Sequence, residues 1–322
     1  MSDRALLDRL GAGAVTGSAL ARELGVTRSA VHKRIESLRA AGVEIHARPG
    51  HGYALAQRLD LLDRDDLLAG LGPEARAQMQ SLRIEFETAS TQSLALQAGA
   101  PDYGSAVWLA ERQTEGQGRR GRRWVSPLAA NLYLSLSRRF DRGFAALSGL
   151  SLAVGVAVAE ALRSLGASQV GVKWPNDVVA DGRKLGGILI QLRGEAQGPC
   201  EAVIGVGLNV RMPANAAADI DQAWCDLSQL LPDEKIVRSA LAANVLDRLL
   251  PALAQFESEG LAPFLPRWRE LDALAGHAVR VLDGARTHEG AALGVDASGA
   301  LRVHIDGSER RFHSGEASLR PL

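Results

Sequence analysis

The sequence predicts an α+β protein of several domains: an N-terminal winged helix-turn-helix, a central α/β domain with a mixed sheet, and a small C-terminal β-barrel. Helical repeats lead into a hairpin in the first 58 residues, and strands then alternate with helices. Residues 276–322 contain only short alternating strands and Gly turns. We expect domains at 1–58, 81–272 and 273–322, with a helical connector at 59–80, because 322 residues suffice for two or three domains.

The first domain is predicted from helical spacing and turn residues. Gly25 ends the second helix, Thr27 can cap the third, and a turn at 48–52 joins strands around Val43 and Tyr53. The apolar faces of the three helices carry Leu6, Leu7, Leu10, Leu20, Leu24, Val31, Ile35 and Leu38.

The opposite face of the third helix is polar and basic. In a winged helix-turn-helix its early residues contact base edges, while a basic hairpin tip meets phosphate. We therefore expect DNA as a partner, and a three-helix interaction module with a charged solvent face is the alternative. The candidate DNA-binding residues are Thr27, Arg28, Ser29, His32, Lys33 and Arg34.

The connector is rich in leucine and acidic residues, and Gly72-Pro73 interrupts it. A strand through 82–86 leads to Ser90 and Thr91, either of which can cap a helix at 92–98. A plain helix cap and a ligand contact are equally good local interpretations. Further strands are expected at 105–110 and 131–137, followed by a long helix at 145–165.

The stretch 116–124, Gly-Gln-Gly-Arg-Arg-Gly-Arg-Arg-Trp, predicts an anion-binding loop. Glycine lets backbone N–H groups approach an anion, and arginine matches a phosphate or carboxylate with a charged fork. A solvated basic loop is the alternative. The glycines also fit a dinucleotide fingerprint with Asp141 as the ribose contact, but Pro127 would stop the helix that such a site requires.

A second stretch, 170–177, delivers Lys173 to the end of a strand beside Pro175. An ammonium there can neutralise charge when a carboxylate attacks a phosphate, although a lone lysine is more often a surface residue. Asp181-Gly182 predicts a tight hairpin into a strand at 184–190. The glycines of the strand at 203–210 would let a flat ligand lie against bare backbone. Pro251 and Pro263 are expected to interrupt a helical region at 230–271.

Composition limits the classes of function. Equal numbers of basic and acidic residues give no overall field for nucleic acid. We expect no apolar run of membrane-spanning length, no signal-peptide core and no protein-built metal site. Cys200 and Cys225 form no metal-type pair, which fits a reducing cytoplasm. Lysine is rare, so each of Lys33, Lys173, Lys184 and Lys235 hints at a need for a compact ammonium.

Four motifs occur in one order: S-T-Q, G-x-G-R-R-G-R-x-W, K-W-P-N-D with K-L-x-G-I-L, and G-V-G-x-N. Together they resemble the biotin protein ligase family over essentially the whole chain. The winged helix makes the chain similar to the bifunctional members that also repress the biotin biosynthesis operon. The resemblance implies an SH3-like C-terminal barrel and a cytoplasmic enzyme without a membrane partner.

The resemblance implies a two-step acyl transfer. The biotin carboxylate attacks the α-phosphate of ATP, with Mg²⁺, and gives biotinyl-5′-adenylate and pyrophosphate. A lysine of a biotin carboxyl carrier protein, an acetyl-CoA carboxylase subunit, then takes the biotin. Biotin would act both as substrate and as corepressor precursor, with operator DNA and a ligand-promoted homodimer as further partners.

The family motifs assign roles by position. Arg119 and Lys173 would be catalytic through charge stabilisation. Biotin would be bound by Ser90, Thr91, Gln92, Gln113, Gln117, Gly118, Arg119, Lys173, Gly187 and Leu189. The nucleotide would be bound by Arg119, Arg122, Trp124, Lys184, Asn209 and Arg320.

Two positions depart from common forms of the family. Gln117 stands where Arg is common, which puts one phosphate contact in doubt, and Gln92 stands where many members have Asn. Three alternatives remain: a lipoate-type acyl-adenylating ligase, a biotin-sensing regulator without catalysis, and a ligase without repression.

Overall fold

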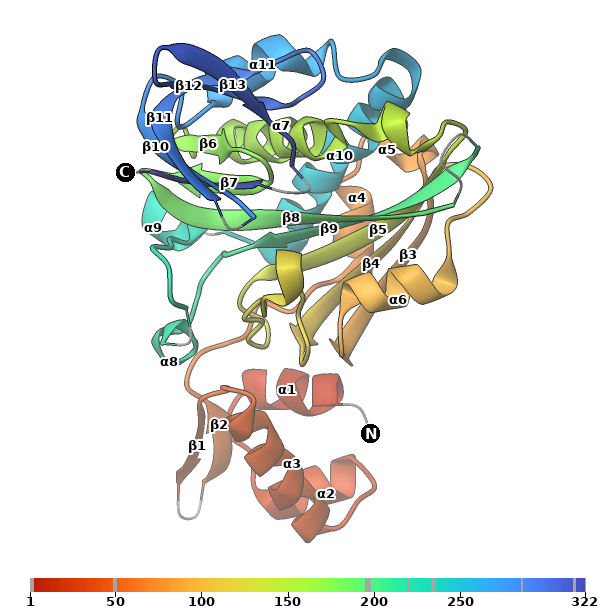
Figure 1. Cartoon of the computed structure of the whole chain (residues 1–322). Helices are drawn as coiled ribbons and strands as arrows, with labels where there is room; N and C mark the ends of the chain where they lie inside the picture. The colour runs from red at the N-terminus through yellow and green to blue at the C-terminus, as the bar shows by residue number, and fades with distance from the viewer. Residues whose placement is uncertain are drawn as a thin grey trace.

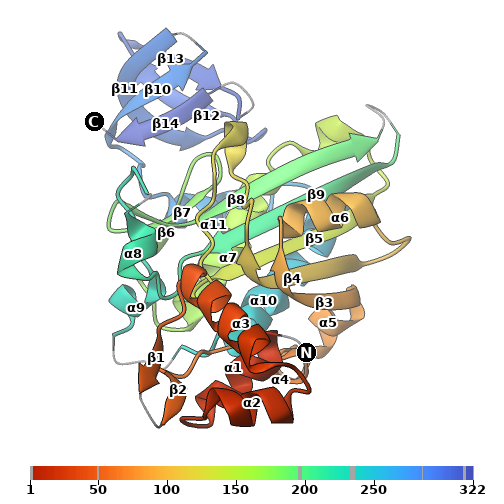
Figure 2. The same cartoon turned by 90° about the horizontal axis from the view of Figure 1, so that it is seen from below.

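The computed structural model describes residues 3–48, 51–194, 198–218, 220–232, 236–284, 286–314 and 317–321. Figure 1 shows a small N-terminal domain below a larger body, with the C-terminal strands at the far end. Figure 2, viewed from below, places the two terminal domains at opposite ends of the central sheet.

The N-terminal domain is a winged helix-turn-helix, as predicted. Helices α1 (Asp3–Gly11), α2 (Gly17–Glu23) and α3 (Arg28–Ala40) precede the hairpin of β1 (Ile45–Arg48) and β2 (Gly52–Leu55). Thr27 caps α3, since its hydroxyl accepts from Ala30 N at 3.2 Å. Gly52 has φ 85°, and a Cβ there would lie 2.1 Å from Val15 O, so only glycine fits. Val43 precedes β1 rather than joining it, and Pro49-Gly50 at the expected tip lies outside the described residues.

Residues 62–77 pack on the core of the central domain, whereas Leu59 and Leu61 pack against the apolar cluster of the N-terminal domain. Helices α4 (Arg64–Ala69) and α5 (Pro73–Ala77) lie against α10, with the predicted break at Gly72-Pro73. Leu62, Leu67 and Ala75 are fully buried in the same apolar cluster as the central sheet. The expected connector is therefore a covering layer of that domain, and its last residues already belong to strand β3.

The central sheet is mixed, in the order β3-β4-β5-β9-β8-β7-β6. Only the β3–β4 pair is parallel. Helix α6 (Thr91–Ala98) packs on one face, and α7 (Leu150–Ser164) and α10 (Arg238–Glu259) pack on the other, as Figure 1 shows. The strands are β3 (Met79–Thr88), β4 (Ser105–Gln113), β5 (Leu132–Phe140), β6 (Val170–Lys173), β7 (Asp177–Ala180), β8 (Arg183–Gly194) and β9 (Cys200–Leu208).

Two helix predictions need correction. The helix expected at 145–165 is split into a 3₁₀ turn, η2 (Phe144–Leu147), and α7, because Gly149 has φ 80°. Pro251 lies inside α10 without ending it, whereas Pro263 is the N-cap of α11 (Phe264–Leu271). Short helices α8 (Ala214–Ala217) and α9 (Leu227–Leu230) precede α10.

The segment Phe144–Ser164 is long and apolar enough to cross a membrane, contrary to the expectation from the sequence. In the structure 67% of its most apolar window is buried. It packs against α10, α11 and strands of the central sheet, so its hydrophobicity is accounted for by the core.

The C-terminal domain is an antiparallel sheet in the order β13-β12-β11-β10-β14. Among the described residues no pairing joins β13 to β14, so the closed SH3-like barrel expected from the resemblance is not confirmed. The turn at Asp306-Gly307 has φ 49° and 80°, as an Asp-Gly hairpin requires. The strands are β10 (Ala278–Asp283), β11 (Arg286–Val295), β12 (Leu301–Ile305), β13 (Ser308–Phe312) and β14 (Ala317–Pro321).

Candidate active site

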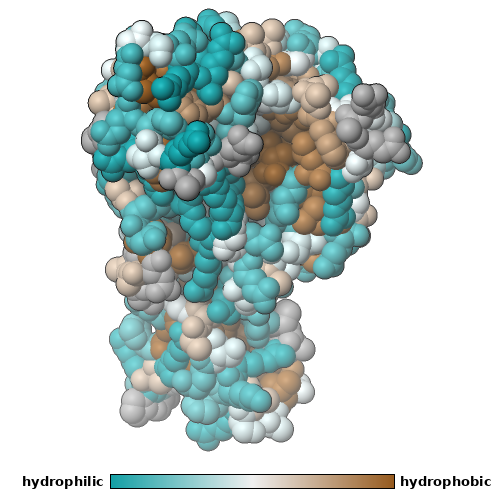
Figure 3. Space-filling view, viewed as in Figure 1, coloured by the Kyte–Doolittle hydropathy of each residue, from teal (hydrophilic) through white to brown (hydrophobic). Residues whose placement is uncertain are grey.

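One cleft brings together every predicted ligand residue of the central and C-terminal domains. It encloses about 1410 Å³, open solvent included, between the sheet, the loop 116–124 and β14. Figure 3 shows a hollow with hydrophobic lining in the larger body. The lining residues named by the sequence are Ser90, Thr91, Gln92, Gln113, Gln117, Gly118, Arg119, Arg122, Trp124, Lys173, Lys184, Gly187, Leu189, Asn209 and Arg320.

The glycine-arginine loop folds over the cleft around a short 3₁₀ turn, η1 (Arg119–Gly121). Gly118 N donates to Arg122 O at 2.6 Å, and Trp124 N donates to Gly116 O at 2.8 Å. Arg119 Nη1 donates to Asn176 Oδ1 at 2.8 Å, and its other terminal nitrogen donates to Ser314 O of the C-terminal domain. The guanidinium therefore bridges the loop, the lysine turn and the last domain.

Two lysines share one carboxylate at the charged end of the cleft. Asp177 Oδ1 lies 2.8 Å from Lys184 Nζ, and Oδ2 lies 3.3 Å from Lys173 Nζ. The hairpin of β6, β7 and β8 creates this triad, because Lys173 pairs with Asp177 across β6–β7 and Lys184 follows Arg183 into β8. Asp181 and Gly182, with φ 49° and 73°, form the predicted tight turn between β7 and β8.

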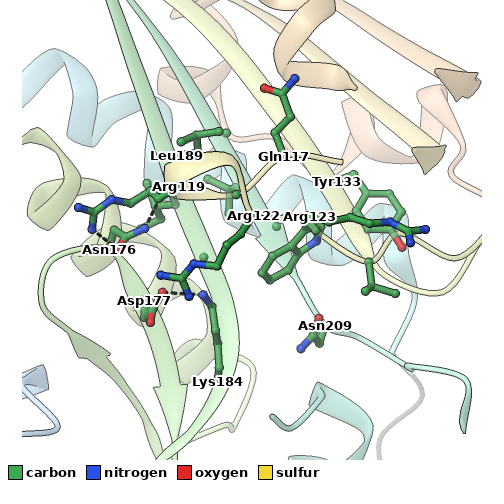
Figure 4. Close-up of a pocket in the computed structure, with 18 of the residues that line it drawn as sticks. Gln117, Arg119, Arg122, Arg123, Tyr133, Asn176, Asp177, Lys184, Leu189 and Asn209 are labelled. Carbon is green, nitrogen blue, oxygen red and sulfur yellow. Dashed lines mark hydrogen bonds and ion pairs between the residues drawn. The ribbon is translucent and has the colours of Figure 1, made fainter. Parts of the chain in front are cut away.

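Figure 4 shows Arg119 and Arg122 pointing toward Asn176 and Asp177, while Arg123 points away. The predicted cations therefore face a common space. An anion entering it would meet a site that already holds excess positive charge, since the single carboxylate of Asp177 lies between two ammonium groups.

Burial and charge perturb the pKa values of these groups. Burial lowers the pKa of Lys173, Asp177 opposes that change, and Lys184 and Arg320 add to it. Burial works against ionisation of Asp177, but Lys184 and Lys173 outweigh it and hold its pKa below the usual range. Burial, with Arg120 and Arg122 nearby, lowers the pKa of Arg119. Perturbed pKa values in a cleft are typical of functional sites.

The other end of the cleft is polar and uncharged. Ser90 is the N-cap of α6, but its side chain makes no capping bond, so the predicted hydroxyl cap is wrong. Thr91 N instead donates to Gln113 Oε1 at 2.8 Å, and Gln113 Nε2 donates to Ser126 Oγ at 3.1 Å. Gln117 Nε2 reaches Ser93 Oγ at 3.3 Å.

The glycines of β9 make room for side chains of the protein itself. A Cβ on Gly205 would lie 2.6 Å from Gln92 Oε1, and one on Gly207 would lie 2.6 Å from Trp124 Cε2. Lys184 Nζ also lies over the Trp124 indole, 5.6 Å from its ring centroid, in a cation–π contact. The indole Nε1 is buried and has no hydrogen-bond partner among the described residues.

The sequence missed several lining residues. Asn176 and Asp177 belong to the K-W-P-N-D motif, and their adjacency to Lys173 was the available signal. Ser135 and Trp224 also line the cleft, and no local pattern marked either one. Asn209 is buried and donates from Nδ2 to Cys225 O at 3.1 Å, so part of its amide is engaged in holding the cleft wall.

Among the described residues no cluster of three His, Cys, Asp or Glu side chains could hold a metal ion. The acid at the centre of the cleft, Asp177, is engaged by Lys173 and Lys184. The chain's own side chains at this site therefore do not fit a resident divalent cation. Cys200 and Cys225 are free and buried.

The predicted DNA-binding residues lie together at the start of α3. Thr27, Arg28, Ser29, His32 and Lys33 are exposed. His32 Nδ1 lies 3.4 Å from Tyr53 Oη of the wing. Arg34 is half-buried, and its guanidinium lies 3.9 Å from Asp3 of α1.

Comparison with known proteins shows to which family the chain belongs. The model of the biotin/lipoate A/B protein ligase family matches residues 88–209, an HTH domain model matches 4–54, and a biotin protein ligase C-terminal domain model matches 275–320. The bifunctional ligase/repressor BirA of Escherichia coli strain K12 is 39% identical over 95% of this chain and 92% of its own length. The chain belongs to the biotin protein ligase family.

Other biotin protein ligases support the same placement. The biotin--[acetyl-CoA-carboxylase] ligase of Mycobacterium tuberculosis is 34% identical over 77% of this chain and 91% of its own length. The solved structure of the Aquifex aeolicus biotin protein ligase in complex with biotin and ATP is 27% identical, with a TM-score of 0.64 over 76% of this chain and 100% of that one. The predicted family and its N-terminal helix-turn-helix are confirmed.

Proposed function

We propose that this biotin protein ligase activates biotin with ATP and transfers it to a lysine of a biotin carboxyl carrier protein. One observation carries the proposal: Arg119, Lys173 and Lys184 converge at one end of a single cleft, while neutral donors and acceptors occupy the other. A carboxylate and a polyphosphate repel each other, so an enzyme that joins them must neutralise charge where they meet.

In the first step a biotin carboxylate oxygen attacks the α-phosphorus of ATP. A C–O–P anhydride bond forms and the bond to the β-phosphate oxygen breaks, so pyrophosphate leaves. Lys173 and Arg119 would stabilise the charge that develops on the α-phosphate oxygens. Lys184, Arg122 and Arg320 would hold the phosphates, and Trp124 and Asn209 the nucleoside.

In the second step a neutral lysine amine of the carrier attacks the acyl carbon of biotinyl-5′-adenylate. An amide bond forms, AMP leaves with the C–O electron pair, and the amine loses a proton to solvent. No enzyme nucleophile is required, because the mixed anhydride is already activated. The protein's part is to orient the anhydride and exclude water beneath the loop 116–124.

The direct test is incubation with biotin, ATP and a carrier domain, followed by avidin blotting. Lys173→Ala should slow carrier labelling by about 10²–10³-fold, the usual cost of removing one charge-stabilising donor. Arg269→Ala is the matched control, because Arg269 is exposed on α11. If neither wild type nor Lys173→Ala labels the carrier, the chain is a biotin-sensing regulator without catalysis.

The family model covers both biotin and lipoate ligases, so acyl specificity needs its own test. Pyrophosphate release should be measured with each acid at the same ATP concentration. Release with lipoate alone would contradict the proposal. The motif K-W-P-N-D followed by Gly186-Gly187 favours biotin.

We also propose that the winged helix binds operator DNA and represses biotin biosynthesis genes when the ligand is present. Exposed Arg28 and Lys33 near the start of α3 support this role. Footprinting with biotin and ATP at fixed salt should reveal specific protection. In a salt titration, Lys33→Ala should reduce the slope of log K for DNA binding against log salt concentration by about one. Arg22→Ala, an exposed charge on α2, is the control. Protection equal to that on random DNA would leave a ligase without repression.

Several finer expectations belong to the same proposal. Mg²⁺ would enter with the phosphates of ATP, because the chain offers no cluster for it among the described residues. The protein would work in the cytoplasm and form a ligand-promoted homodimer. Its working units would be residues 1–58, 81–272 and 273–322, with the connector 59–80 lying as a covering layer on the central unit.

A further inference from the structure

Four polar side chains, three of them buried and Gln113 half-buried, form a chain of hydrogen bonds at the uncharged end of the cleft. They come from α6, β4 and β5, and Gln92, Thr91 and Ser135 are each at most 3% exposed. Gln92 Oε1 accepts from Ser135 Oγ at 3.2 Å, and Ser135 Oγ lies 2.8 Å from Thr91 Oγ1. Thr91 Oγ1 lies 3.1 Å from Gln113 Oε1. Such a chain has a direction, because each hydroxyl carries only one proton.

Gln92 fixes that direction. Its Nε2 donates to the backbone carbonyl of Val203 at 3.1 Å, so its carbonyl oxygen must face Ser135. Ser135 therefore gives its only proton to Gln92. Gly205 leaves the space for this arrangement, since a Cβ there would lie 2.6 Å from Gln92 Oε1.

The proton of Thr91 must then point away from the cleft. The 2.8 Å contact with Ser135 needs the Thr91 proton, because the Ser135 proton is already used. The alternative acceptor, Gln113 Oε1, also lies inside the chain and already takes Thr91 N–H at 2.8 Å. Either way Thr91 Oγ1 presents lone pairs to the cleft.

Gln113 presents the opposite character. Because its Oε1 accepts from Thr91 N, its Nε2 faces the other way and gives one hydrogen to Ser126 Oγ at 3.1 Å. The second hydrogen of that nitrogen is available to a ligand. The cleft thus offers an acceptor at Thr91 and a donor at Gln113, side by side.

We propose that Gln92 and Ser135 are positioning residues that hold this acceptor–donor pair in register with a cyclic urea, whose N–H donates to Thr91 and whose C=O accepts from Gln113. The proposal rests on the proposed function and explains how the site selects its acid. The dithiolane ring of lipoate has no N–H and no carbonyl, so it would leave both groups unpaired in a buried site.

The proposal predicts what happens when the direction of these hydrogen bonds is reversed. In Gln92→Leu the Ser135 proton loses its acceptor and turns to Thr91 Oγ1, where it competes with the ligand N–H. Biotin affinity should fall about tenfold, which corresponds to one hydrogen bond. Removing the competing hydroxyl, in Gln92→Leu with Ser135→Ala, should restore part of the lost affinity. A purely structural role for Gln92 predicts a further loss instead.

Titration calorimetry of the full-length protein with biotin, without ATP, is the main measurement. Desthiobiotin, which keeps the cyclic urea, should follow biotin through the series, whereas weak lipoate binding and the KM for ATP should stay constant. The proposal would be overturned if the double variant bound biotin no more tightly than Gln92→Leu does. It would also be overturned if biotin and lipoate affinities changed in parallel, or if wild type did not bind biotin. Pyrophosphate release, measured separately, tests the ligase activity itself.

Discussion

A buried ion pair in the central domain gives a direct test of how the domains are held together. Arg238 Nη1 of α10 lies 2.6 Å from Glu111 Oε2 of β4, and their side chains are 2% and 0% exposed. Glu111 Oε1 also accepts from Leu62 N at 2.6 Å and lies 3.9 Å from Arg4 Nη1 of the DNA-binding domain. The carboxylate therefore joins β4, the covering layer and α1. The perturbation is Glu111→Gln.

The structure sets the magnitude. Removing one partner of a buried ion pair costs about 3–5 kcal/mol, because the other charge remains buried without its counter-ion. Arg238 keeps its bonds to Asn131 O at 3.0 and 2.8 Å and to Asp60 O at 2.7 Å, which favours the lower end of that range. A loss of about 3 kcal/mol lowers the melting temperature of a domain of this size by about 6–12 °C.

Calorimetric melting of wild type and variants is the assay. Glu87→Gln is a matched control, because Glu87 pairs with Arg112 at the same 2.6 Å but its side chain is 47% exposed. The control should cost less than about 1 kcal/mol. Combining Glu111→Leu with Arg238→Met removes both charges and should regain stability relative to Glu111→Gln. A Glu111→Gln shift no larger than that of Glu87→Gln would refute the reasoning.

Three further predictions concern the cleft and its supports. Gly207→Ala should displace the Trp124 indole and weaken nucleotide binding about tenfold, an overpacking cost of about 1.4 kcal/mol. Gly11→Ala is the control, because its Cβ would make only ordinary contacts, at 3.8 Å to Leu55 and 3.9 Å to Arg58; equal nucleotide affinities of the two variants would count against the prediction. Burial raises the pKa of Asp272 to about 6 from 3.8, against the Leu274 N–H and His277. Asp272 therefore keeps its proton to a higher pH in the folded protein than in the unfolded chain. Wild type should lose up to about 3 kcal/mol of stability as the pH rises from about 4 through 6. Asp272→Asn should remove that slope, and an unchanged slope in urea unfolding would exclude Asp272 as its source. Finally, trypsin should cut at the arginines of 116–124 in the free protein, and biotin plus ATP should slow the cut; unchanged cutting would disprove ordering by ligand.

The sequence predicted those features that depend on neighbouring residues. Thr27 caps α3, and Asp181-Gly182 forms a tight turn. Both depend on backbone sterics and side-chain contacts between residues that are close in the sequence. The arginines of the loop 116–124 and Lys173 were identified from residue type and local pattern. Lys184 and Arg320 were named only because the chain resembles the family.

Other local signals gave the wrong result because packing overrode them. Pro251 was expected to break a helix, but α10 continues through it, held by burial of its apolar face against α7 and the sheet. Ser90 stands at the start of α6 without capping it by its side chain. The closed barrel stays a prediction, because it depends on pairing between edge strands, which short-range patterns do not determine.

The sequence by itself determined the local elements, the motif residues and the excess of positive charge near them. Only the tertiary structure decided which groups share space: Asp177 between two lysines, Glu111 against Arg238, and Gln92 and Trp124 over the glycines of β9. The physical reason is that backbone preference acts between adjacent residues. Burial, ion pairing and the direction of a proton depend instead on atoms that folding brings together from distant parts of the chain.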